Sequence, residues 1–167
     1  GLLPHIISGT SAGSVVGAIL CTRTNDELKR DLMPEILSTK LICFARPWKE
    51  RIRSVIDNGN LFSIDDWMEL IRWFSCDDMT FEEAYRKTGR ILCITLTSTT
   101  KKAPSVLLNY LSTPNVTIAS AVVASAAVPG FVPPVKLLQK DPTTGEVTEV
   151  GGDSYFDGSI ERDIPID

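Results

Sequence analysis

The sequence predicts an α/β domain with a largely parallel central sheet, because segments with strand character alternate with segments that have helical character. The predicted strands are short and rich in β-branched residues, whereas several predicted helices begin at capping residues. A glycine-containing turn joins the first strand directly to the first helix. The 167 residues are 43% hydrophobic and 23% charged, which is typical of a globular domain that buries its own core.

The first half of the chain is expected to contain one strand and three helices. They are a buried strand over 5–8, an apolar helix over 12–21, a short helix over 26–33 and an amphipathic helix over 67–73. Asn25 is the expected N-cap of the short helix, and Pro34 is expected to end it. Ser63 and Asp66 have the spacing of a capping box before the amphipathic helix. Residues 41–60 have no clear pattern.

The second half is expected to begin with a helix that Thr80 and Glu83 cap at its start and Gly89 ends. The further elements are a strand over 91–97, its partner strand over 106–110, a small-residue helix over 117–127, a hairpin around 141–145 and a short strand over 155–156. Pro129 follows the small-residue helix and marks its end.

Gly9-Thr10-Ser11-Ala12-Gly13 matches the pattern GxSxG between the first strand and the first helix. A serine in a tight strand-to-helix turn points its hydroxyl outward, and we expect the flanking glycines to let strand and helix approach without Cβ clashes. The amides at the start of the helix are suited to stabilise an oxyanion. The motif is short, so a simple Gly/Ser turn is the alternative reading. The strand before it and the helix after it favour a nucleophile elbow.

The chain has one histidine, His5, which lies six residues before Ser11 at the far end of the same strand. At about 3.3 Å per residue it is up to about 20 Å from the hydroxyl, too far for a general base. A base must therefore lie outside these residues or be another group. Asp157 is the candidate, since it ends a short apolar strand; an ordinary Asp-Gly turn with Gly158 is the alternative.

The composition excludes several classes of function. A net charge of −4 gives no sign of a nucleic-acid partner. The four cysteines are scattered, which argues against a metal site and fits reduced, mostly buried thiols facing the cytosol: Cys21, Cys43, Cys76 and Cys93. The sequence contains no run of about 18 apolar residues and no basic n-region, so we expect no transmembrane segment here and no secretion.

Four blocks occur in order along the chain. They are Gly9-Thr10-Ser11-Ala12-Gly13-Ser14, then Met79-Thr80-Phe81-Glu82-Glu83-Ala84 with Thr88-Gly89-Arg90-Ile91-Leu92, then Ala124-Ser125-Ala126-Ala127-Val128-Pro129, and finally Asp157-Gly158-Ser159. Through these blocks the chain resembles the patatin-like phospholipase family, and most closely its fungal and plant triacylglycerol lipase branch. The third block is similar to the family's ASxxxP pattern, and Ser159 stands where many members carry Gly or Ala.

The resemblance implies a three-layer α/β/α sandwich and a Ser-Asp dyad, carried here onto Ser11 and Asp157, that works through an acyl-enzyme without metal or cofactor. It implies lipid ester substrates, triacylglycerol or phospholipid, met at a lipid droplet or a cytosolic membrane surface. We expect residues 1–167 to form one incomplete catalytic domain, because the family's glycine-rich oxyanion loop lies upstream of the first strand.

Three alternatives to a triacylglycerol lipase stay open. One is a phospholipase A, lysophospholipase or lysolipid acyltransferase; another is a non-catalytic scaffold on a lipid surface; the third is an ordinary α/β-hydrolase with a histidine downstream. Ser125 is a second candidate hydroxyl, but it lacks the elbow context and is expected to serve packing. The amphipathic helix is expected to turn its aromatic side chains toward the protein core rather than toward lipid: Trp67, Trp73 and Phe74.

Overall fold

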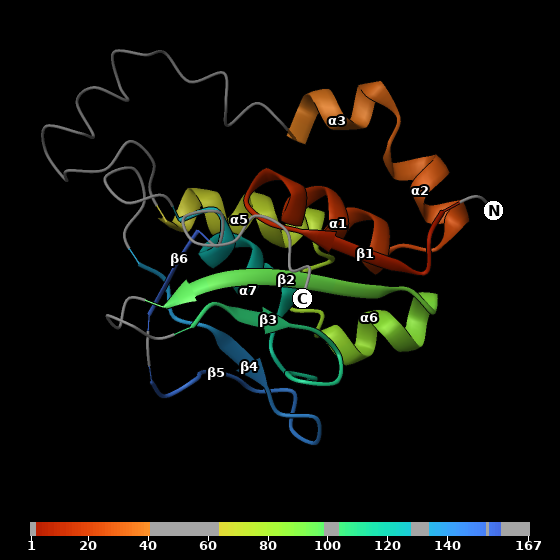
Figure 1. Cartoon of the computed structure of the whole chain (residues 1–167). Helices are drawn as coiled ribbons and strands as arrows, with labels where there is room; N and C mark the ends of the chain where they lie inside the picture. Colours follow the sequence, from red (N-terminus) through yellow and green to blue (C-terminus); the bar gives the residue numbers. More distant parts are fainter. Residues whose placement is uncertain (1–2, 41–63, 99–103, 128–133, 153, 158–167) are drawn as a thin grey trace, which may run out of the picture.

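The structure is a computed structural model of the chain and describes residues 3–40, 64–98, 104–127, 134–152 and 154–157. The helices are α1 (Ala12–Thr22), α2 (Asn25–Asp31), α3 (Pro34–Lys40), α5 (Ile64–Phe74), α6 (Phe81–Thr88) and α7 (Ile118–Ser125). The strands are β1 (Ile6–Gly9), β2 (Ile91–Ser98), β3 (Val106–Leu108), β4 (Leu138–Lys140), β5 (Val147–Glu149) and β6 (Tyr155–Asp157). Figure 1 shows how these elements are arranged.

Strand β2 is the centre of the main sheet. It pairs with β1 in parallel and with β3 and β6 antiparallel, while β4 and β5 form a separate hairpin. The α/β class is confirmed. The central sheet was expected to be largely parallel, but among the described strands it is mixed, with one parallel and two antiparallel pairings along β2. The short link from Ser98 to Val106 explains why β3 is antiparallel to β2, because a parallel connection needs a crossover of about a dozen residues or more.

The core lies between β2 and a group of helices beside it. Leu92, Ile94 and Leu96 alternate along β2, so their side chains share one face of the sheet, and all three are buried. They belong to one hydrophobic cluster with residues of α1, α5 and α7, including Ala18 and Ala121. These three helices contact one another, and Figure 1 shows them packed together beside β2.

Two of the expected helix boundaries need correction. The N-cap of α2 is Thr24 rather than Asn25, because the Thr24 hydroxyl accepts from the Glu27 N–H and the Glu27 carboxylate accepts from the Thr24 N–H. Pro34 does not merely end this segment; it is the first residue of α3. Proline is tolerated there because the first helical N–H has no partner within the helix.

The boundaries of α6 confirm the prediction. The Thr80 hydroxyl accepts from the Glu83 N–H at 3.2 Å, and the Glu83 carboxylate accepts from the Thr80 N–H at 2.9 Å. Gly89 ends the helix in the left-handed region at φ 69°, a conformation that glycine adopts without a Cβ penalty. The expected hairpin around 141–145 is also confirmed, by the pairing of β4 with β5.

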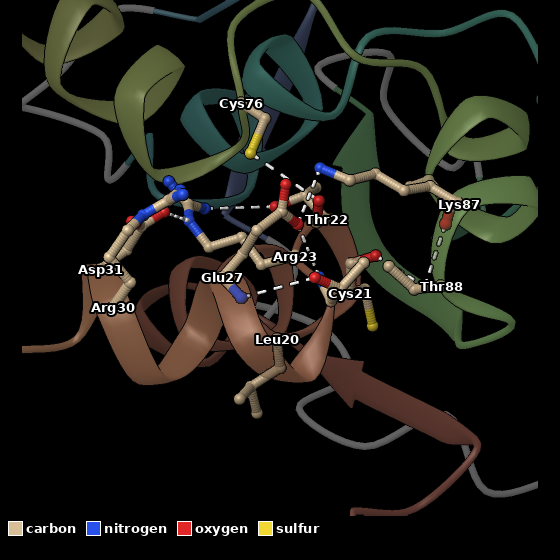
Figure 2. A network of polar contacts seen from close by, with 12 residues as sticks. Leu20, Cys21, Thr22, Arg23, Glu27, Arg30, Asp31, Cys76, Lys87 and Thr88 are labelled. Carbon is tan, nitrogen blue, oxygen red and sulfur yellow. Dashed lines mark hydrogen bonds and ion pairs between the residues drawn. The ribbon is translucent and has the colours of Figure 1, made fainter.

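The C-terminal end of α1 is held by the buried side chain of Arg23 (Figure 2). Its guanidinium donates to the carbonyls of Trp73 and Phe74, each at 2.6 Å, and to the Asp31 carboxylate at 3.0 Å. A forked donor of this kind can satisfy several acceptors at once. Arg23 therefore ties the end of α1 to the end of α5.

Carbonyls in the last turn of a helix have no partner within it, and α1 buries this end. Arg90 donates to the carbonyls of Leu20 and Arg23 at 2.6 and 2.8 Å, and the Thr88 hydroxyl donates to the Cys21 carbonyl at 2.9 Å. A cation at a helix C-terminus also interacts favourably with the helix dipole. These contacts fix the orientation of α1, whose other end follows Ser11.

The predictions for the cysteines and the aromatic residues can be checked only where the structure describes them. Cys21 is buried and free, whereas Cys76 and Cys93 are free and only half-buried; Cys43 lies outside the described residues. Phe74 is buried and Trp73 packs against the core, as predicted. Ser63, residues 41–60, the side chain of Trp67 and Pro129 fall outside the description. In the described part of the chain, no helix has the length and apolar character needed to cross a membrane.

Candidate active site

Ser11 occupies the turn between β1 and α1, at φ 52° and ψ −126°. Residues other than glycine rarely adopt positive φ, and such strained positions persist only where the surrounding structure holds them. The context is a strand before the motif and a helix after it, which is the context that a GxSxG elbow requires. The strand–turn–helix context that the sequence predicted around Ser11 is therefore present, although the residues of β1 are exposed or half-buried rather than buried.

The two glycines of the motif have different roles. A Cβ on Gly9 would lie 2.3 Å from the carbonyl oxygen of Gly13 and 2.7 Å from the backbone nitrogen of Ser14, so only glycine fits. A Cβ on Gly13 would meet nothing within 4 Å. The expected close approach of strand and helix is therefore confirmed at Gly9 and wrong at Gly13, whose backbone is instead the surface that Gly9 contacts.

The amides at the start of α1 are mostly occupied. The Ser11 N–H donates to the hydroxyl of Ser125 at 3.0 Å, the Gly13 N–H to the carbonyl of Thr10 at 2.9 Å, and the Ser14 N–H to the carbonyl of Ser11 at 3.0 Å. No described residue accepts a hydrogen bond from the N–H of Ala12, and Ala12 is an exposed residue. The Ala12 amide is therefore available to an incoming oxyanion.

Ser125, in the last turn of α7, contacts the elbow directly. Its side chain is fully buried, and its hydroxyl donates to the Thr95 carbonyl at 3.1 Å while it accepts from the Ser11 N–H. The sequence suggested only a packing role for this residue. Its place in the Ala124-Ser125 pair of the third block was the one available signal, since a hydrogen bond between residues 114 positions apart leaves no local pattern.

Asp157 is the last residue of β6 and is 2% exposed. Its backbone N–H donates to the carbonyl of Ala127, just beyond α7, at 3.1 Å. Its partner on β2 is Leu96, whereas Gly9 at the end of β1 is opposite Ile94. Asp157 therefore lies at a strand end in the main sheet, as the sequence predicted.

The ends of β1 and β6 converge. Strand β3 occupies one edge of β2 at Ile94, Thr95 and Leu96, so β1 and β6 share the other edge. Because β1 is parallel and β6 antiparallel to β2, the two strands point toward each other. Gly9 and Asp157 are opposite residues only two positions apart on β2, and the chain after Gly9 turns into the elbow.

His5 lies at the opposite end of β1. Its side chain is exposed, and its carbonyl accepts from the Ile91 N–H at 2.7 Å, where β2 begins. The expectation that His5 is remote from Ser11 along the strand is therefore confirmed. Gly158 and Ser159, which complete the fourth block, lie outside the described residues.

Comparisons with known proteins show which proteins the whole chain is similar to. A family model described as Patatin-like phospholipase matches residues 1–167. Patatin-like phospholipase domain-containing proteins of Cryptococcus neoformans, Yarrowia lipolytica and Candida albicans are similar to the chain, with identities of 43%, 42% and 41%. Each comparison covers 99% of this chain but only 19%, 20% and 20% of the relative. The chain thus spans about a fifth of the length of these curated relatives.

Proposed function

Because the chain belongs to the patatin-like phospholipase family, we propose that it forms the core of a lipid acyl hydrolase in which Ser11 is the nucleophile and Asp157 is the general base. The observation that carries this proposal is the convergence of β1 and β6 at one edge of β2. It brings the strained serine turn and a buried carboxylate to the same part of the sheet. His5, the one histidine of the sequence, lies at the other end of β1.

The reaction that we propose has two halves. The Ser11 hydroxyl oxygen attacks the ester carbonyl carbon while its proton passes to the Asp157 carboxylate. The oxyanion accepts a hydrogen bond from the Ala12 N–H, and the tetrahedral intermediate then collapses. The C–O bond to the alcohol breaks, the alcohol leaves with the proton from Asp157, and an acyl ester remains on Ser11.

Water completes the second half. Asp157 accepts a proton from the water as its oxygen attacks the acyl carbonyl, and the bond between the acyl carbon and Ser11 breaks. The Ser11 oxygen recovers the proton, and the free fatty acid leaves. The strained backbone of Ser11 and the exposed residue Ala12 belong to the same turn, which supports a nucleophile and an oxyanion donor acting side by side.

We propose triacylglycerol at a lipid-droplet surface as the substrate, because the four sequence blocks are most similar to the triacylglycerol lipase branch. Phospholipid at a cytosolic membrane surface is the second candidate, favoured by the name that the curated relatives share. Emulsified triacylglycerol and phospholipid vesicles, offered separately to the full-length protein, distinguish the two. Faster release of fatty acid from the vesicles would replace the first candidate by the second.

The roles of the two residues are tested in the full-length protein with a fluorophosphonate probe and an ester assay. Ser11→Ala should abolish labelling, and Asp157→Asn should slow ester hydrolysis about 10²- to 10⁴-fold, the usual contribution of a general base. Asp141→Asn, in the exposed turn between β4 and β5, is the matched control and should keep full activity. Activity of Asp157→Asn within a few-fold of the parent would rule out the dyad. A parent protein that is never labelled at Ser11 would favour a non-catalytic scaffold.

A further inference from the structure

We infer that Ser125 is a positioning residue that clamps the elbow of Ser11 onto the central sheet. The inference rests on the proposed role of Ser11 as nucleophile and adds to it a residue that need not touch the substrate. Its hydroxyl lies between the two elements that it joins, the Ser11 N–H at 3.0 Å and the Thr95 carbonyl at 3.1 Å.

The elbow needs such a contact because its backbone conformation is unfavourable by itself. At φ 52° Ser11 is in a region that persists only where neighbouring groups hold it. The Ser11 carbonyl is held locally, by the N–H of Ser14 at 3.0 Å and the Ser14 hydroxyl at 2.6 Å. The bond from its N–H to Ser125 is the contact that ties Ser11 to a distant part of the fold.

Thr95, the other partner of Ser125, lies at the point where the two strand ends converge. It stands on β2 between Ile94, which is opposite Gly9, and Leu96, which is opposite Asp157. The segment just beyond α7 also holds the second strand, since the carbonyl of Ala127 accepts from the Asp157 N–H at 3.1 Å. Ser125 and Ala127 thus contact the backbone of both residues of the proposed dyad, and α7 sets how β6 and the elbow lie relative to each other.

The hydrogen bonds also fix what Ser125 does not do. Its single hydroxyl proton is directed to the Thr95 carbonyl, and the side chain is fully buried, so it is not a second nucleophile. Its oxygen occupies the Ser11 N–H, which is therefore not an oxyanion donor. That leaves the Ala12 N–H as the free donor among the described amides at the start of α1.

The test is Ser125→Ala in the full-length protein, with Ser120→Ala as a matched control. Ser120 is in the same helix and equally buried, and its hydroxyl also accepts from a backbone N–H, that of Leu138 at 3.0 Å, and donates to a carbonyl, that of Thr117 at 2.9 Å. The Ser120 hydroxyl also accepts from the Thr117 hydroxyl at 2.9 Å, so Ser120→Ala loses one more hydrogen bond than Ser125→Ala, but only Ser125 contacts the elbow. Ser120→Ala is therefore expected to lose at least as much thermal stability as Ser125→Ala.

Only Ser125→Ala is expected to slow the reaction of Ser11. A displacement of the nucleophile on the order of 1 Å costs up to about 100-fold in rate, so we expect kcat and the rate of fluorophosphonate labelling to fall roughly ten- to a hundredfold with little change in KM. Hydrogen exchange of the peptide that contains Ser11 should become faster in Ser125→Ala and stay unchanged in Ser120→Ala. Ser125→Cys keeps the shape and a weak acceptor, and should give an intermediate rate.

The outcomes separate this inference from the proposed function. If the parent is labelled at Ser11 and Ser125→Ala is labelled equally fast, the inference is wrong and the proposed function stands. Equal slowing by Ser120→Ala, or a cysteine variant no faster than alanine, also overturns it, because a general loss of packing would then explain the effect. If the parent is not labelled at all, the proposed function fails first. If Ser125→Ala does not fold, the labelling rate of Ser125→Cys is compared with that of the parent instead. Equal rates then overturn the inference.

Discussion

Replacing Gly9 by alanine is the substitution whose effect the structure defines most sharply. The new Cβ would lie 2.3 Å from the carbonyl oxygen and 2.4 Å from the carbonyl carbon of Gly13. Both are backbone atoms, so no side-chain rotation can relieve the contact. Gly9 does not have positive φ, and the cost therefore comes from the clash rather than from the backbone conformation.

The size of the effect follows from the gap that must open. A contact of 3.0 to 3.4 Å requires strand and helix to separate by 0.7 to 1.1 Å at this point. Overpacking of this kind costs about 1–3 kcal/mol of the free energy of unfolding. Along the chain, Ser11 stands midway between Gly9 and Gly13, so it moves when they separate. A shift of about 1 Å at a reacting group costs on the order of 100-fold in rate, equivalent to about 2.7 kcal/mol.

The assay compares Gly9→Ala with Gly13→Ala in the full-length protein by thermal unfolding and by the rate of fluorophosphonate labelling of Ser11. The second variant adds the same methyl group four residues away, where it meets no described atom within 4 Å. We expect it to unfold at the same temperature or slightly higher, because alanine is the better helix former. A Gly9→Ala protein that matches Gly13→Ala in stability would refute the reasoning from the close approach.

Three further predictions concern residues away from the elbow. Burial raises the pKa of Cys21 to about 12, so its thiol should resist iodoacetamide at pH 8 in the folded protein while the half-buried Cys76 reacts; mass spectrometry of the alkylated peptides checks this, and equal labelling would contradict it. The backbone N–H of Thr24 is the main cause that holds the pKa of Glu27 at about 2, below its ordinary value of 4.5. The ionised Glu27 carboxylate therefore stabilises the fold fully above about pH 4.5, and this contribution is lost as the pH falls toward 2. In Glu27→Gln the free energy of unfolding, measured by urea titration, should fall less between pH 4.5 and 2 than in the parent. An equal fall in both proteins would contradict the assignment. Arg23→Lys should lower the free energy of unfolding by about 1–3 kcal/mol for each carbonyl that the ammonium leaves unsatisfied. Urea denaturation measures this loss, and no measurable loss would show that a lysine ammonium can replace the forked guanidinium.

Short-range rules were enough for the elements whose ends depend on adjacent residues. Thr80, Glu83 and Gly89 define α6 because a capping box and a left-handed C-cap act within one turn. The same rule applied one residue earlier would have found Thr24, since Thr24-Asn25-Asp26-Glu27 has the capping-box spacing. Pro34 was ambiguous, because a proline that cannot continue a helix is well suited to begin one.

The candidate site was predictable only in part. The residues of the elbow and the end of β6 could be proposed from local sequence and from the family resemblance. The directions of the strands could not be predicted in this way, because the pairing of Asp157 with Leu96 depends on contacts between distant segments. The clamp by Ser125 was missed for the same reason, and the close approach was wrongly shared between Gly9 and Gly13, since only coordinates show which glycine faces backbone.

The hydrogen bond from Ser11 to Ser125 spans 114 residues, and Asp157 lies farther still along the chain. During synthesis the ribosome delivers the serine long before α7 and β6 exist, so the elbow has neither its distant anchor nor the opposing carboxylate. Long-range contacts of this kind form late in folding. Under the proposed mechanism, a nascent chain that stops short of Asp157 therefore carries the GxSxG motif without its general base, and hydrolysis becomes possible only once nearly the whole segment has emerged and folded.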